Sequence, residues 1–280
     1  MAAGAMLGPM VVESVRTELI HAGRCLPDGV RDDVLALGQA AVPELVAILQ
    51  EEALLAETAP GEGWSPIHAV DLLGELRAVD AIEAMVRLLA GTDFLDIVHD
   101  RILVRMPQIG APVVEPVLQA YADSTDEDFR LSMAAVLSRA GVRDERIFAL
   151  LVDRLDNDPS AEAHHLVDYG DRRALPHLHR ALDRCVLASD GIPFANQDLI
   201  ELRAAIEGLG GVLTGEQRAT MRRVDEHARA ARTALFGGPR PRATALRPPK
   251  RGRNEPCWCD SGRKYKVCHL RADQDALLVG

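Results

Sequence analysis

The sequence predicts an all-α protein, and three observations carry that prediction. Hydrophobic residues make up 48% of the 280 residues but aromatic residues only 4%, and helix-forming Ala, Leu and Arg outnumber the aromatic and β-branched residues that strands prefer. Apolar residues recur at helical spacing rather than in alternation. A sequence pattern that contains a glycine also repeats through most of the chain. Together these features favour helices packed on helices.

The repeated pattern predicts a short apolar helix that ends near a glycine, followed by turn residues and a second apolar helix. Successive glycines are 36, 36, 31 and 29 residues apart, and a degenerate sixth unit lies near Gly208 or Gly210. The regular members are Gly38, Gly74, Gly110, Gly141 and Gly170. Spacings of this length are typical of two-helix repeats.

The clearest unit spans residues 66–89. Pro66 begins a helix with one apolar face, Gly74 is expected to supply a left-handed turn residue, and Asp80 is expected to cap the second helix. The apolar positions of the two helices are Ile67, Val70, Leu73, Leu76, Ile82, Met85, Val86 and Leu89. A single pair cannot bury both of its faces, so neighbouring pairs must stack.

These units resemble HEAT-like repeats over roughly residues 30–215. Asp80-Ala81-Ile82 and Arg173-Ala174-Leu175-Pro176 stand where that family places its inter-helix turn and second helix. The resemblance implies an α-solenoid of about five to six helical pairs in a domain of residues 1–236. A non-repeating helical bundle is the alternative.

Charge divides the chain. Residues 1–236 hold 22 Arg and 38 acidic residues, a net charge of −16, whereas residues 237–271 hold 10 Arg or Lys and two acidic residues, a net charge of +8. Residues 237–250 are rich in Gly, Pro and Arg without an apolar period, which indicates a flexible basic linker. Residues 51–65, which are acidic and contain Trp64, read as a long loop between repeats.

Four metal-ligating residue types fall within thirteen positions near the C-terminus: Cys257, Cys259, Cys268 and His269. Two close pairs separated by a turn, Asp260-Ser261-Gly262, can complete the tetrahedron of thiolate and imidazole that Zn²⁺ prefers. So short a segment has almost no core, so the metal would supply most of its folding free energy. A disulfide, unliganded thiols and iron are the alternatives.

The segment resembles the SEC-C motif, named for the C-terminal tail of the bacterial protein-export ATPase. The shared residues beside the four ligands are Gly252-Arg253-Asn254, Pro256, Ser261-Gly262 and Lys264-Tyr265-Lys266, whereas Trp258 and Asp260 depart from the usual Pro and Gly. The resemblance implies a zinc module over residues 251–270 that docks on another protein. Residues 271–280 follow it as a C-terminal tail.

Three cations, Arg263, Lys264 and Lys266, surround the predicted metal site. They can offset the negative charge of three thiolates on Zn²⁺, and they can also bind an acidic protein or phosphate. We therefore expect these three residues to contribute to partner binding.

No catalytic constellation accompanies the zinc motif. The sequence has no Gly-rich phosphate loop or nucleophile elbow, and no His is followed by Glu, as a di-iron site on HEAT-like repeats would require. The following histidines are interpreted as surface or helix-end residues: His68, His99, His164, His165, His177 and His179.

The chain is therefore predicted to be a non-catalytic adaptor that binds a protein partner through a helical surface and a zinc module, without a small-molecule substrate. One alternative is a nucleic-acid or ribosome-associated factor that uses the basic tail. Another is an enzyme with an unrecognised site, for example beside Trp64 and His68. No membrane span or secretory signal is recognised, so we expect a cytoplasmic protein.

Overall fold

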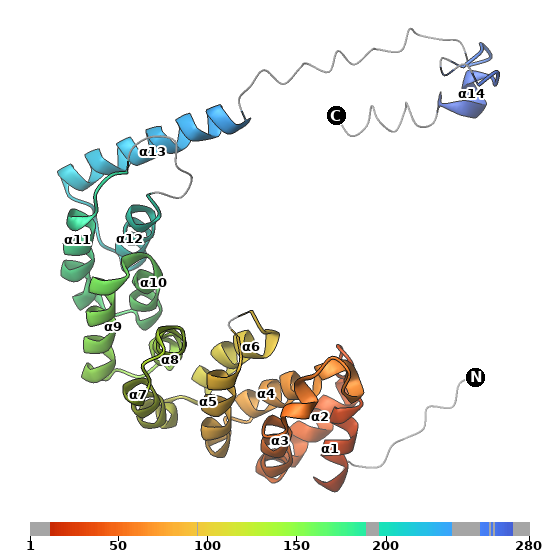
Figure 1. Ribbon diagram of the computed structural model, residues 1–280, viewed down its shortest axis with the longest axis vertical. Coiled ribbons are helices and arrows are strands. Elements are labelled where there is room, and N and C mark those ends of the chain that lie inside the picture. Colours follow the sequence, from red (N-terminus) through yellow and green to blue (C-terminus); the bar gives the residue numbers. More distant parts are fainter. Residues whose placement is uncertain are drawn as a thin grey trace. The chain divides into compact units, whose positions relative to one another are not determined.

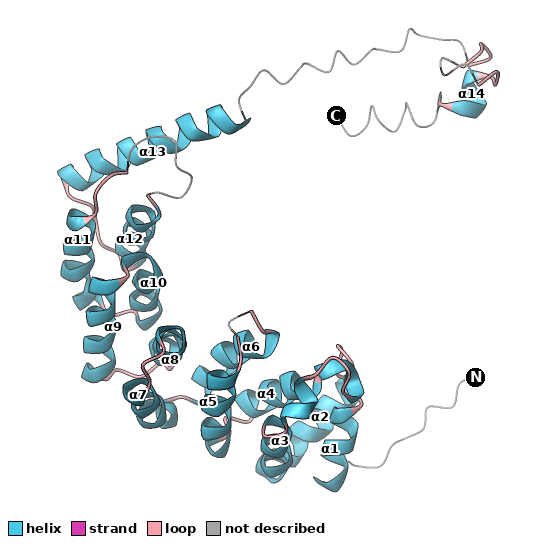
Figure 2. Cartoon of the chain, in the orientation of Figure 1, coloured by secondary structure: helices cyan, strands magenta, loops and turns pink. Residues whose placement is uncertain are grey.

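The computed structural model describes residues 12–93, 95–188, 196–236, 253–257, 259 and 261–270. These residues form helices and connecting segments but no strand (Figure 2), which confirms the all-α prediction. The chain divides into two compact units, Met1–Ala188 with Phe194–Val224 and Ser189–Pro193 with Asp225–Gly280. None of the described helices combines the length and the hydropathy that crossing a bilayer requires.

Figure 1 shows the order of the helices along the chain by colour. Helix α13 (Gly215–Phe236) contains the division between the units, and α14 (Tyr265–Cys268) belongs to the second. The first unit contains α1 (Val12–Ile20), α2 (Asp28–Leu37), α3 (Val42–Leu49), α4 (Ser65–Glu75), α5 (Ile82–Gly91), α6 (Ile97–Arg105), α7 (Val114–Asp123), α8 (Glu127–Arg139), α9 (Glu145–Asn157), α10 (Pro159–Tyr169), α11 (Leu175–Arg184) and α12 (Gln197–Gly208). Short 3₁₀ turns join several of them, at Gly38–Ala41, Glu52–Leu55, Pro60–Gly63, Val79–Ala81, Met106–Ile109, Ala111–Val113 and Arg172–Ala174.

Within the first unit, helices pack mainly on helices one or two places away in the chain. Helix α4 contacts α3 and α6, and α10 contacts α8, α9 and α12. The core they share is aliphatic, and its fully buried side chains include Leu45, Leu73, Met85, Ile102, Leu137 and Leu151. Burial of aliphatic surface between such neighbours is the main source of stability for short helices.

Four of the five repeat glycines adopt the left-handed backbone that the turn prediction requires: Gly38, Gly110, Gly141 and Gly170 have φ between 60° and 87°. A residue with a Cβ is disfavoured there, which explains glycine at these positions.

The predictions for Gly74 and Asp80 are wrong. Gly74 lies inside α4, and the positive φ of 49° falls on Arg77. A Cβ on Gly74 would lie 2.7 Å from the Cβ of Arg105 on α6, so glycine is needed there for close helix packing. Asp80 lies in a 3₁₀ turn, and no side chain caps α5.

The predicted linker (237–250) and C-terminal tail (271–280) lie outside the described residues. The domain boundaries proposed from the sequence therefore stay a prediction.

Candidate functional site

The described residues between 253 and 270 fold back on themselves through backbone hydrogen bonds. The Cys257 amide donates to the Arg263 carbonyl at 2.8 Å, and the Tyr265 amide donates to the Glu255 carbonyl at 2.8 Å. Pro256 and Lys264 form an antiparallel bridge between the two arms. Gly262, with φ of +70°, lies in the reversal between them. This pairing brings the first cysteine of the motif beside α14.

Helix α14 positions the second ligand pair. It is a single turn that ends at Cys268, and the His269 amide donates to the Tyr265 carbonyl at 3.1 Å. Tyr265 is buried and anchors the start of this turn. Cys268 and His269 are therefore held together at its C-terminal end.

The structure brings all four predicted ligands together. One donor atom from each of Cys257, Cys259, Cys268 and His269 lies within 4.8 Å of every other. Cys257 Sγ lies 3.2 Å from His269 Nδ1, and Cys259 Sγ lies 3.5 Å from Cys268 Sγ. A tetrahedral zinc site with bonds of ~2.3 Å to sulfur has sulfur–sulfur edges of about 3.8 Å. The donor separations fit a single ion of this size.

The thiols of the first pair differ in acidity. Burial raises the pKa of the Cys257 thiol. Hydrogen bonds from the Ser261 hydroxyl and backbone amide lower the pKa of Cys259 to about 6, so this thiol is ionised at neutral pH. A thiolate is the form that binds a metal, so Cys259 in the folded module is in the form suited to that role.

The three predicted partner-binding residues, Arg263, Lys264 and Lys266, are exposed. Within the described part of the chain none of their side chains forms an ion pair. Their backbones do hold the module, because the Arg263 carbonyl accepts from Cys257 and the Lys266 amide donates to the Arg253 carbonyl at 3.0 Å. The charged ends are thus accessible while the main chain maintains the fold.

A second group of ionisable side chains lies inside the helical unit, between α9 and α10. Arg154 Nε donates to Glu162 Oε1 at 2.7 Å, and His165 Nδ1 lies 3.0 Å from Glu162 Oε2. The side chains of Glu162 and His165 are only 1% and 2% exposed. Burial alone would raise the pKa of Glu162, but hydrogen bonds from His165 and Arg154 outweigh it, so the pKa is lowered and the group stays ionised.

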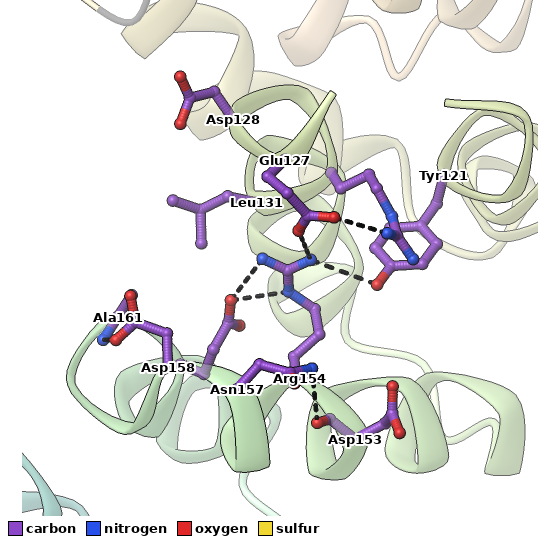
Figure 3. Close-up of a pocket in the computed structure, with 11 residues that line it drawn as sticks. Tyr121, Glu127, Asp128, Leu131, Asp153, Arg154, Asn157, Asp158 and Ala161 are labelled. Carbon is purple, nitrogen blue, oxygen red and sulfur yellow. Dashed lines mark hydrogen bonds and ion pairs between the residues drawn. The ribbon is translucent and has the colours of Figure 1, made fainter. Parts of the chain in front are cut away.

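A hollow of about 510 Å³ lies beside this group (Figure 3). Figure 3 shows the Arg154 guanidinium reaching across it towards Tyr121 of α7 and Glu127 of α8, at 3.3 and 3.4 Å. Glu127 also accepts a hydrogen bond from Arg130 at 2.7 Å. These polar groups are satisfied mainly by one another, so the cluster is a structural network that joins four helices.

The interpretation of the histidines as surface or helix-end residues is wrong for three of them. His68, His99 and His165 are buried. His68 Nε2 lies 2.8 Å from the Gly23 carbonyl, and His99 Nε2 lies 3.0 Å from Ser132 Oγ. Sequence reasoning missed these contacts because most of the partners lie on other segments. The Glu162–His165 pair, at helical i,i+3 spacing, is the one signal that could have been found.

Comparison with known proteins identifies the C-terminal segment. The family model of the SEC-C motif matches residues 253–271, which confirms the resemblance noted in the sequence. Protein translocase subunit SecA of Anaeromyxobacter sp. (strain Fw109-5) is 48% identical over 59 residues, which cover 20% of this chain and 6% of that protein. The chain thus matches only a small part of that relative. No solved structure matches.

Proposed function

We propose that this protein is a non-catalytic adaptor that holds one Zn²⁺ on Cys257, Cys259, Cys268 and His269 and presents the resulting module to a protein partner. The observation that carries the proposal is the convergence of four donors within 4.8 Å in a segment that matches the SEC-C motif.

The donor set favours zinc in a structural role. Three sulfurs and one imidazole nitrogen complete a tetrahedron and leave no position for substrate or reactive water, which a catalytic zinc site keeps open. Structural zinc sites often combine three thiolates with one imidazole, whereas iron–sulfur sites are usually held by four thiolates. When bound, the ion would supply folding free energy, and the chain's own residues would do the recognition. This is the basis for proposing that the protein is not an enzyme.

Repeated contacts in the first unit support a HEAT-like solenoid of about five to six helical pairs. Asp144 accepts a hydrogen bond from the Arg146 amide at 2.8 Å, and the Arg146 side chain contacts both Asp144 and Glu115, which lies 31 residues earlier. The same contacts recur in the next helical repeat of this unit. Asp171 accepts a hydrogen bond from the Arg173 amide, and the Arg173 side chain contacts both Asp171 and Glu145, which lies 28 residues before Arg173. These separations of 31 and 28 residues are close to the glycine spacings of 31 and 29 residues, as expected for stacked repeats.

We place the repeat domain at residues 1–236, a flexible linker at 237–250 and the zinc module at 251–270. Two binding surfaces joined by a linker gain avidity if the linker spans both sites on the partner. Cysteines that remain available as zinc ligands suit the reducing cytoplasm, where we place the protein.

A nucleic-acid or ribosome-associated role is the second candidate, because the exposed Arg263, Lys264 and Lys266 could contact phosphates. Salt separates the two candidates. The logarithm of affinity for nucleic acid falls by roughly 0.7 to 0.9 per phosphate contact for each tenfold rise in salt. A protein partner should show a shallower dependence.

Replacing Arg263, Lys264 and Lys266 together by Ala is expected to leave zinc content unchanged and to weaken capture of the partner. The side chains are exposed and the backbone holds the module, so the fold should not depend on them. The measurement is quantitative affinity purification with the parent chain, the triple variant and a chain truncated before residue 237. Equal capture by the parent and the triple variant would assign recognition to the helical domain instead.

A further inference from the structure

A second surface of interest lies in the first unit, where the acidic loop that interrupts the repeats meets the start of α6. These segments enclose a hollow of about 470 Å³. Its apolar lining includes Leu55 and Trp64 from the loop and Leu95 and Ile97 from the α6 end. We call this hollow the loop groove.

Two of the apolar side chains in the loop groove are unusually accessible. Leu95 is 78% exposed and Ile97 is 54% exposed, whereas Leu55 and Trp64 are half-buried against the core. Exposed apolar side chains gain stabilising free energy when a partner buries them. A hollow lined by them, with polar residues around it, is typical of a binding surface rather than of ordinary solvated protein.

The rim of the loop groove carries charge of one sign. Glu57, Glu62 and Asp96 line it, and none of its described lining residues is basic; the Arg24 guanidinium, outside this lining, lies 5.8 Å from the centroid of the Trp64 ring. In the described part of the chain none of these three carboxylates forms an ion pair; Asp96 accepts a hydrogen bond from the Asp93 amide at 2.9 Å. By contrast, the less exposed carboxylates of Asp71 and Glu162 are paired with Arg105 and Arg154. The groove therefore keeps negative charge available for a cation.

The backbone of the loop is fixed in an unusual conformation. Gly61, Glu62 and Gly63 all have positive φ, of 70°, 56° and 80°. A Cβ on Gly61 would lie 2.5 Å from the Ala22 carbonyl, and one on Gly63 would lie 2.9 Å from the Leu55 carbonyl. Glycine is thus required at both positions, and Glu62 adopts a conformation that costs a non-glycine residue about 1 kcal/mol or more. This packing fixes the backbone on the loop side of the groove.

We propose that the loop groove docks a segment of a protein partner that carries both apolar side chains and Arg or Lys. The apolar floor would bury the partner's aliphatic side chains, and the three carboxylates would pair with its cations, which complementarity of charge favours. This inference rests on the proposed adaptor function and deepens it, because it assigns the helical domain a chemical class of partner segment.

The test uses the full-length chain and fluorescence anisotropy with a labelled peptide of alternating leucine and arginine. Replacing Leu95 and Ile97 together by Ser should weaken its binding at least about tenfold, because two apolar contacts are lost. Both residues are exposed, so the fold should be unaffected. The matched control is Val104→Ser with Val186→Ser, which changes residues that are 50% and 86% exposed and lie outside the groove.

Two further peptides separate the parts of the proposal. A peptide of alternating leucine and glutamate should bind much more weakly, because the acidic rim repels its glutamates. A peptide of alternating serine and arginine should also bind weakly, because it has no apolar side chains to bury against the apolar lining. Equal binding of the leucine–glutamate peptide, no binding of the leucine–arginine peptide, or equal losses in the groove and control variants would overturn the proposal.

The same assay distinguishes this proposal from the zinc-dependent function. A chain with Cys257→Ser and Cys268→Ser should still bind the leucine–arginine peptide, because the groove residues all lie in the first unit. Suppose that the variant without zinc still binds the peptide, but the parent chain captures no partner through residues 251–270. That result would refute the zinc adaptor but not the groove. Capture through the tail without peptide binding would refute the groove alone.

Discussion

Serine at both Cys257 and Cys268 is expected to abolish zinc binding and to unfold residues 253–270. The described part of this segment has only two buried residues, Cys257 and Tyr265. A core of that size cannot offset the conformational entropy of ordering the chain. Structural zinc supplies about 10 to 16 kcal/mol to small modules of this kind. Loss of two ligands should therefore remove the fold of the module altogether.

The unfolding can be followed in amide NMR spectra of the labelled full-length chain, by the loss of dispersed signals from residues 253–270. The matched control is Cys25→Ser with Cys185→Ser, which removes two thiols outside the site and should leave the module signals in place. Module signals that stay dispersed in the ligand variant would show that the segment folds without metal. Helix signals from the first unit should be unchanged in both variants.

Replacing Glu162 by Ala is expected to lower the free energy of unfolding of the helical unit by about 3 to 5 kcal/mol. Arg154 and His165 both contact this carboxylate, and removal of one partner leaves a buried cation uncompensated. The measurement is urea denaturation followed by circular dichroism. Glu145→Ala is the matched control, since it breaks an ion pair with Arg173 at an exposed position and should change stability by less than about 1 kcal/mol.

The buried Glu162 carboxylate also predicts a pH dependence of stability with a definite sign. Because the pKa of Glu162 is lowered below its ordinary value of 4.5 in the folded protein, its contribution is present above that pH and is lost as the pH falls through the folded-state pKa. The stability difference between the parent and Glu162→Gln should therefore be largest near neutral pH and should shrink below about pH 4.5. A difference that stays constant on acidification would mean that the carboxylate is not ionised in the native state.

The parts of the molecule that depend on local spacing could be predicted from the sequence. The metal ligands converge because Cys257 and Cys259 lie one reversal away from Cys268 and His269, and the turn at Gly262 has the left-handed backbone that glycine permits. The glycine turns of the helical unit follow the same logic.

Features that depend on distant neighbours could not be predicted in this way. A glycine such as Gly74 can permit either a left-handed turn or close helix packing, and the sequence alone does not distinguish the two. The close approach of Arg105 shows that packing is the reason here. His99 is buried because Ser132, on another helix, lies against it. The loop groove likewise joins Trp64 to Leu95 across segments that sequence spacing does not relate.

Zinc stoichiometry will show whether the four C-terminal donors hold one ion in a closed site. Elemental analysis by mass spectrometry of the full-length protein, purified without added metal, should find one zinc per chain. The Cys257→Ser, Cys268→Ser variant, prepared in parallel, should contain none. A parent protein that lacks zinc, or a variant that retains the full amount, would show that these four residues do not hold the ion.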